Sequence, residues 1–214
     1  MQESDHQRDA QGALSRRTIR GAVALTTGLA VAGCATVPSV NAPESEIAAA
    51  VYRDRGPPAL TLYTRTDAAS VVGQHTALMI DASQRVVFDP SGSFKASGIP
   101  ERNDVLFGIT PQARDVFENF YAQGGDGLEV QRVEVPAAVA ERALQLAVAH
   151  GAVGSGFCTD ATVGILRALP GFEGLTPTFF PGRLADEFGA LPGVTTTLRP
   201  HRSDQDVGNS QSPA

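Results

Sequence analysis

The first 34 residues have the pattern of an export signal and not of a folded domain, so the fold has to be built from the residues that follow them. A basic segment, SRRTIR at residues 15–20, precedes an apolar run of Ala, Val, Leu and Gly that ends at Cys34. Such a run is too short to cross a bilayer as a helix. Residues 1–33 are therefore predicted to be a signal peptide, and an ordinary apolar N-terminal helix is the alternative.

The apolar run ends in Val31, Ala32, Gly33 and Cys34, which resembles a bacterial lipobox, in which a pair of small residues precedes a cysteine. This resemblance implies that Cys34 becomes the mature N-terminus and carries acyl lipid such as palmitate. SRRTIR also resembles a twin-arginine signal, although Ile19 and Arg20 depart from its usual apolar pair. We therefore expect a lipoprotein of the bacterial cell envelope, anchored in a membrane by lipid on Cys34 and facing the periplasm.

Composition divides the remaining chain into three parts. Residues 34–58 hold four prolines and show no sustained period, which predicts a lipidated tether, with a short helix over 44–53 compatible with the pattern. Residues 200–214 are polar with almost no apolar anchor and are predicted to be a disordered tail. Residues 59–199 are long enough to form one domain with its own core.

Charge and residue counts exclude some classes of function. The chain has a net charge of −6, and an acidic protein is a poor candidate for binding nucleic acid. The predicted domain has two histidines and one cysteine without metal-ligand spacing, so no metal or other cofactor is expected.

Periodicity and turn residues predict an α+β domain, an antiparallel sheet flanked by helices. A turn over 81–84 should join two strands in a hairpin. Thr110 and Pro111 are the expected start of one helix, whose apolar face would hold Val116, Phe117, Phe120 and Tyr121. Gly151 should end another helix in a left-handed conformation. The expected strands are 60–66, 74–80, 85–89, 128–135 and 194–198, and the expected helices are 111–122, 137–150, 158–169 and 181–191.

Cys158 is the residue that raises the question of function. With lipid on Cys34 it has no intramolecular partner, and an odd cysteine in an exported chain suggests a reactive thiol or intermolecular pairing. It begins a predicted helix behind the loop 154–156 (GSG). A helix N-terminus favours the thiolate, and its free N–H groups can bind an oxyanion. The alternative is a small buried residue behind a flexible connector.

Elimination among four histidines leaves one candidate base for this thiol. His6 leaves with the signal, and His201 lies in the tail. His150 ends a predicted helix, where a cation complements the C-terminus. His75 begins the apolar strand QHTALMI and is the remaining candidate.

The order of these segments resembles a known family. A histidine opening HTALMI, a hairpin to RVVFDPSGSF, and a later cysteine that starts a helix are similar to the circularly permuted papain-like hydrolases. These include NlpC-type cell-wall peptidases with reversed Cys and His order, and relatives of lecithin retinol acyltransferase. Over residues 60–170 the resemblance implies a permuted papain-like fold with Cys158 as nucleophile, His75 as general base and Asp89 as third member.

The resemblance also implies a reaction: hydrolysis or acyl transfer on an amide or ester, with a peptidoglycan stem peptide as the nearest substrate. The alternative is a non-catalytic envelope lipoprotein that serves as a binding or structural module, in which Cys158 is only buried.

The role of Asp89 depends on the hairpin loop. His75 and Asp89 share a face of the sheet if the loop holds an odd number of residues, and lie on opposite faces if it holds two or four. The segment 89–92 (DPSG) also has the preferences of a type I turn, which would explain Asp89 without catalysis.

Overall fold

A computed structural model describes residues 41–65, 67, 74–123 and 127–200. The predicted signal peptide, the lipidation site Cys34 and the tail from residue 201 lie outside these ranges. Within them, no helix combines the length and the apolar character that a membrane crossing requires.

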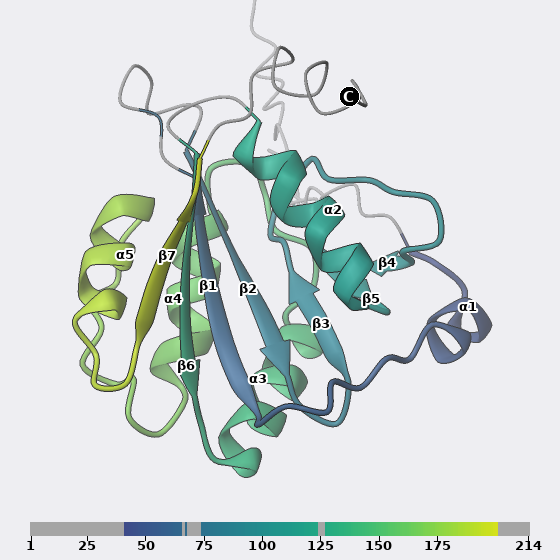
Figure 1. Cartoon of the computed structure of the whole chain (residues 1–214), viewed down its shortest axis with the longest axis horizontal. Coiled ribbons are helices and arrows are strands. Elements are labelled where there is room, and N and C mark those ends of the chain that lie inside the picture. Colours follow the sequence, from purple (N-terminus) through teal and green to yellow (C-terminus); the bar gives the residue numbers. More distant parts are fainter. Residues whose placement is uncertain (1–40, 66, 68–73, 124–126, 201–214) are drawn as a thin grey trace, which may run out of the picture. The chain divides into compact units, whose positions relative to one another are not determined.

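The described ranges contain seven strands and five helices (Figure 1). In chain order these are α1 (Glu44–Ala49), β1 (Ala59–Arg65), β2 (His75–Asp81), β3 (Arg85–Phe88), β4 (Glu101–Arg102), β5 (Val105–Phe107), α2 (Pro111–Ala122), β6 (Leu128–Glu134), α3 (Ala137–His150), α4 (Cys158–Arg167), α5 (Pro181–Gly189) and β7 (Thr195–Arg199). Each of the five expected strands and four expected helices is present, with ends that differ by at most two residues. The short helix over 44–53 is present as α1 and ends four residues earlier.

The seven described strands form one sheet in the order β4-β5-β3-β2-β1-β6-β7, and each neighbouring pair is antiparallel. This arrangement confirms the α+β class. The central strands β1 and β2 are buried along almost their whole length, so both of their faces must be covered.

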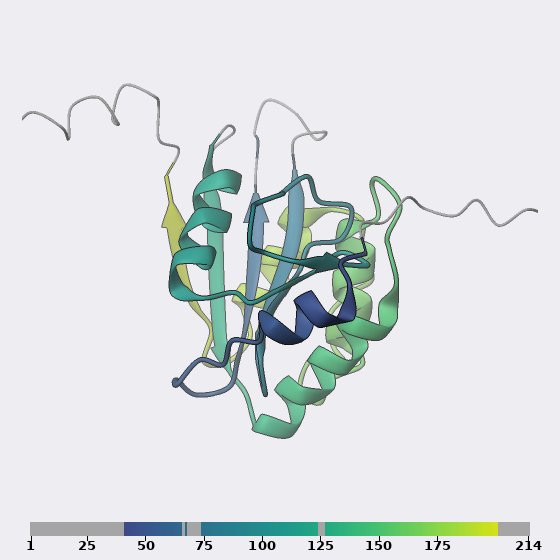
Figure 2. The same cartoon turned by 90° about the vertical axis from the view of Figure 1, so that its right-hand side faces the viewer.

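Helices cover both faces of the sheet. Side chains alternate along β2, so that Leu78 and Ile80 pack with α3, α4 and α5, whereas Ala77 and Met79 pack with α2. Figures 1 and 2 show α2 on one side of the sheet and α3 and α4 on the other. The result is three layers, with β2 running between the α2 and α4 layers.

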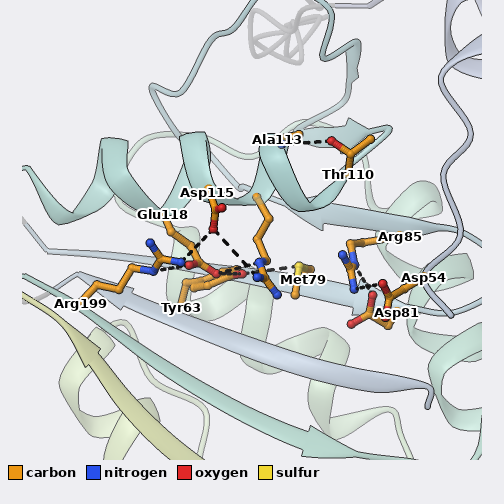
Figure 3. A network of polar contacts seen from close by, with 11 residues as sticks. Asp54, Tyr63, Met79, Asp81, Arg85, Thr110, Ala113, Asp115, Glu118 and Arg199 are labelled. Carbon is orange, nitrogen blue, oxygen red and sulfur yellow. Dashed lines mark hydrogen bonds and ion pairs between the residues drawn. The ribbon is translucent and has the colours of Figure 1, made fainter. Parts of the chain in front are cut away.

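Polar contacts fix α2 on its face of the sheet (Figure 3). The Thr110 hydroxyl caps the helix by accepting a hydrogen bond from the Ala113 N–H at 3.1 Å. Further along, the buried Glu118 accepts a hydrogen bond from the Tyr63 hydroxyl at 2.8 Å and forms an ion pair with Arg199. These contacts set the orientation of the helix about its axis.

That orientation differs from the predicted one. Val116 and Phe120, both expected on the buried face, are 51% and 38% exposed, whereas Phe117 and Tyr121 are buried as expected. The physical reason is Glu118. Its carboxylate has buried partners in Tyr63 and Arg199, and these contacts rotate the helix so that Glu118 faces the sheet.

The folded part of the chain also begins earlier than the predicted boundary at residue 59. The α1 side chain Ile47 is 7% exposed and belongs to the core, and the Ala42 N–H donates to the Glu101 carbonyl at 2.8 Å. The Arg85 N–H donates to the Tyr52 carbonyl at 2.7 Å. Residues 41–58 are therefore part of the domain and not of a tether, because one apolar side chain and several backbone groups find partners there.

The sheet contains one hairpin that the sequence analysis did not predict, β4–β5. Arg102 pairs with Val105, so the loop consists of Asn103 and Asp104, with φ values of 49° and 64°. Two successive positive φ values are typical of a type I′ turn, and Asn and Asp tolerate them well. The strands were missed because they have only two and three residues.

Candidate active site

The three residues that the sequence analysis singled out lie at one end of the sheet. His75 is the first residue of β2, Cys158 is the first residue of α4, and Asp89 directly follows β3. His75 and Cys158 line a cavity of about 440 Å³. A larger cavity of about 650 Å³, between α1 and the segment 95–101, has neither histidine nor cysteine in its lining.

The hairpin loop has three residues, Ala82–Gln84, because Asp81 pairs with Arg85. The odd number puts His75 and Asp89 on the same face, as one of the two predicted alternatives requires. The register places Asp89 next to Ala77, so that His75 is its diagonal neighbour, a distance that an imidazole can bridge. Indeed the His75 Nε2–H donates to Asp89 Oδ1 at 2.7 Å.

Asp89 also begins a tight turn, but not of the expected type. The Gly92 N–H donates to the Asp89 carbonyl at 3.0 Å, and Ser91 has a φ of 52°. A positive φ at the third position, after a proline that fixes its own φ near −65°, is typical of type II and not of type I. The turn uses the backbone of Asp89 and leaves its carboxylate for His75, so the two predicted roles coexist.

Gly92 is required by the position of that carboxylate. A Cβ atom at residue 92 would lie 2.0 Å from Asp89 Oδ2. Any other residue would have to move the carboxylate or the turn.

Tyr121 on α2 completes the polar chain and was not predicted as part of a site. Its hydroxyl donates to the Asp89 carboxylate, with distances of 3.0 and 2.8 Å to the two oxygens, and its ring stacks on His75 with centroids 4.9 Å apart. Burial, together with the charge and hydrogen bonding of Asp89, raises the pKa of Tyr121, which therefore stays a neutral donor. The available signal was chemical: a buried tyrosine hydroxyl requires a polar partner.

Asp104, on the unpredicted hairpin, holds two loops of the site together. Its Oδ2 accepts hydrogen bonds from the Ser91 N–H at 3.0 Å and from the Val153 N–H at 2.8 Å. Its carbonyl accepts from the Asp89 N–H at 2.8 Å. The turn that carries Asp89 and the loop that leads to Cys158 are thus fixed to one residue.

Cys158 is a free thiol that is 8% exposed. Its neighbour Thr159 hydrogen-bonds through its hydroxyl to the Thr76 hydroxyl at 3.1 Å, which ties the start of α4 to β2. Burial by itself would raise the pKa of Cys158, but hydrogen bonding to His75, the charge of that ring and the Thr76 N–H outweigh burial and lower it. The site therefore favours the thiolate.

The pKa of His75 shifts in the opposite direction to that of Cys158. Burial would lower its pKa, but the hydrogen bond to Asp89, the hydrogen bond to Cys158 and the negative charges of both outweigh burial and raise the pKa to about 9. The shifts of the two pKa values, downward for the thiol and upward for the imidazole, both favour the thiolate–imidazolium pair, the charge state of an activated cysteine.

The surroundings of the thiol offer a place for a developing oxyanion. The first N–H groups of α4 lack partners within the helix, and Ser155 and Gly156, directly before it, line the cavity. Gly156 has a φ of 86°, a conformation that favours glycine.

The remaining candidates are not part of this cavity. His150 is exposed at the end of α3, with its ring 5.3 Å from that of Phe88. Gly151, which follows, has φ 85° and ψ 175°, a glycine-specific extended conformation and not the expected left-handed helical one. In the part of the chain that the structure describes, no group of three or more His, Cys, Asp or Glu side chains could hold a metal ion.

Comparisons of the chain with protein-family models, with curated proteins and with solved structures found no match. The function is therefore inferred from the geometry and charges of the cavity and from the N-terminal sequence pattern.

Proposed function

We propose that this protein is a thiol hydrolase or acyltransferase of the bacterial cell envelope, with a circularly permuted papain-like arrangement and a lipid anchor on Cys34. The observation that supports it is the chain of contacts from Cys158 through His75 to Asp89 beside a cavity, with the pKa of the thiol lowered and that of the imidazole raised.

The first half of the reaction forms a thioester. The Cys158 thiolate attacks the carbonyl carbon of an amide or ester, and the carbonyl electron pair moves onto its oxygen, near the N-terminus of α4. When this intermediate collapses, the bond to the leaving group breaks, and the His75 imidazolium gives its proton to the leaving nitrogen or oxygen. The acyl group then remains on sulfur.

The second half restores the enzyme. Water, or an acceptor amine or alcohol, attacks the thioester, and neutral His75 takes the proton from the attacking group. The carbon–sulfur bond breaks, and the electron pair returns to Cys158 as thiolate. Water makes the protein a hydrolase, and an acceptor makes it an acyltransferase.

Asp89 and Tyr121 act through His75 as positioning residues. The Asp89 carboxylate fixes one ring nitrogen and stabilises the imidazolium, and the Tyr121 hydroxyl and ring hold the carboxylate and the imidazole in place. The resemblance to NlpC-type peptidases and the envelope location indicate peptidoglycan stem peptides as substrate.

The state of the thiol gives the first test. The mature protein is treated with iodoacetamide from pH 5 to 10, and alkylation of the Cys158 peptide is followed by mass spectrometry. Labelling should persist well below the free-thiol pKa of about 8.5, and His75→Ala should move the profile back up, whereas His150→Ala should not. Slow labelling that does not depend on His75 would instead support the alternative, a non-catalytic lipoprotein with a buried cysteine.

Turnover gives the second test. Purified stem peptides are incubated with the protein, and cleavage products are identified by mass spectrometry. We expect cleavage by the wild type and none by Cys158→Ala.

A further inference from the structure

The cavity that holds Cys158 has an uneven charge distribution. Its lining includes the basic side chains Arg65 and His75, and no aspartate or glutamate among the described residues lines it. His75 is engaged with Asp89 and Cys158. Arg65 is thus the lining charge whose purpose the proposed mechanism leaves unexplained.

Arg65 is the last residue of β1 and pairs directly with His75 across the two strands. Its Nε is buried and has no hydrogen-bond partner, and no carboxylate in the described ranges forms an ion pair with it. Arg65 is half-buried, and a buried N–H that gives up water without gaining a partner destabilises the fold. A ligand that supplies the missing acceptor would remove this cost.

Other arginines of the domain show the usual solution. Arg85 pairs with Asp54 at 2.9 Å and also with Asp81, and Arg199 pairs with Asp115 at 3.0 Å. Arg114 Nε also lacks a hydrogen-bond partner, but it lies 3.6 Å from Glu118 Oε1 in an ion pair. Arg65 differs from these three arginines because it forms no ion pair among the described residues.

We infer that Arg65 binds a carboxylate of the substrate, so that the amide or ester cleaved at Cys158 carries an anionic group close to the reacting carbonyl. This inference rests on the proposed function. The planar guanidinium presents two parallel N–H donors that match the two oxygens of a carboxylate.

The rest of the cavity supports a single anionic contact. Phe179 and Phe180, 54% and 61% exposed, lie at its border and offer apolar surface without charge. The substrate therefore places its carboxylate near the end of β1 and an uncharged portion against these rings.

Two alkylating reagents that differ only in charge test the inference. Iodoacetyl-glycine carries a carboxylate, and iodoacetyl-glycinamide carries a neutral amide in its place. Both alkylate Cys158, and the ratio of their rates at pH 7 measures the preference for the anion. Because each variant is compared with itself, changes in thiolate content cancel in the ratio.

We expect Arg65→Gln to lower this ratio roughly tenfold or more, since hydrogen bonds to charged groups are strong. Arg65→Lys should retain part of the preference. The exposed Arg142→Gln on α3 makes the same change in net charge and should leave the ratio unchanged.

The outcomes separate the two proposals. If Arg65→Gln keeps the ratio, or slows both reagents equally, Arg65 does not recognise an anion and the inference is wrong, even where labelling remains fast and dependent on His75. If the neutral reagent reacts slowly with the wild type and His75→Ala changes nothing, the proposed function fails first.

Discussion

The charge of His75 depends strongly on its neighbours. Asp89 lies 2.7 Å from its ring, and the hydrogen bonds and charges of Asp89 and Cys158 raise its pKa to about 9 against the effect of burial. A raised pKa means that the imidazolium persists through neutral pH and is lost only as the pH rises through about 9. The proton that the proposed mechanism transfers to the leaving group is therefore present on His75 near neutral pH.

Asp89→Asn should lower the pKa of His75. The amide keeps a similar shape but removes the negative charge, so the imidazolium should lose its proton at a pH well below 9. An NMR titration of the imidazole resonances measures this directly, and His150, which lies outside the cavity, serves as the control in the same spectrum. Equal His75 midpoints in the two proteins would contradict the role given to Asp89.

Gly92→Ala should damage the site by displacing the Asp89 carboxylate, because the new methyl group would lie 2.0 Å from Oδ2. Overpacking of this kind costs about 1–3 kcal/mol of unfolding free energy. Gly164→Ala in α4 is the matched control, since a Cβ there meets nothing within 4 Å and alanine favours a helix by about 1 kcal/mol. Urea denaturation should show opposite signs for the two variants, and equal effects would rule out the predicted clash.

Helix α2 places Tyr121 in the site, where its hydroxyl contacts Asp89. The first turn of this helix is stabilised by the Thr110 side chain, which caps it (Figure 3). Thr110→Ala should lower the free energy of unfolding by about 1 kcal/mol, whereas Thr110→Ser keeps an acceptor for the Ala113 N–H and should lose much less. Denaturation midpoints at constant m value give the comparison. If serine and alanine behave alike, the hydroxyl does not cap the helix.

The longer elements could be predicted because each has a period and a boundary signal. The helix from Pro111 follows a threonine and begins with proline, and the strand from His75 is an unbroken apolar run. Strands β4 and β5 could not be found in this way, since two or three residues show no period. Their signal was the adjacent pair Asn103 and Asp104, which tolerates the two positive φ values of the turn.

The site was predictable only in part, for a related reason. Cys158 and His75 stood out because few cysteines and histidines exist. The contact between His75 and Asp89 requires an odd number of residues in the hairpin loop, and the local sequence did not determine that number. Tyr121 and Asp104 join the site through contacts distant in sequence, with Asp89 and with Val153, and no local pattern encodes them.

The lipid anchor proposed on Cys34 would decide where the protein works. Intact-mass analysis of the membrane fraction should find Cys34 as the first residue, carrying acyl chains, and Cys34→Ser should release the protein from the membrane. A mature N-terminus at another residue, or membrane association that survives Cys34→Ser, would show that the lipobox resemblance is misleading.

If Cys34 carries lipid, as proposed, the docking of the chain from residue 41 onward would limit how far the domain can move from the membrane. An isolated bridge joins Asn41 to Arg102, and Cys34 lies 7 positions before Asn41 in the sequence. Seven residues of any conformation span at most roughly 25 Å, at about 3.6 Å per residue. A tether reaching residue 59 would have allowed about 90 Å by the same measure. An anchored domain would therefore stay close to the membrane surface. Substrates would have to come within this short distance of the lipid headgroups to be cleaved.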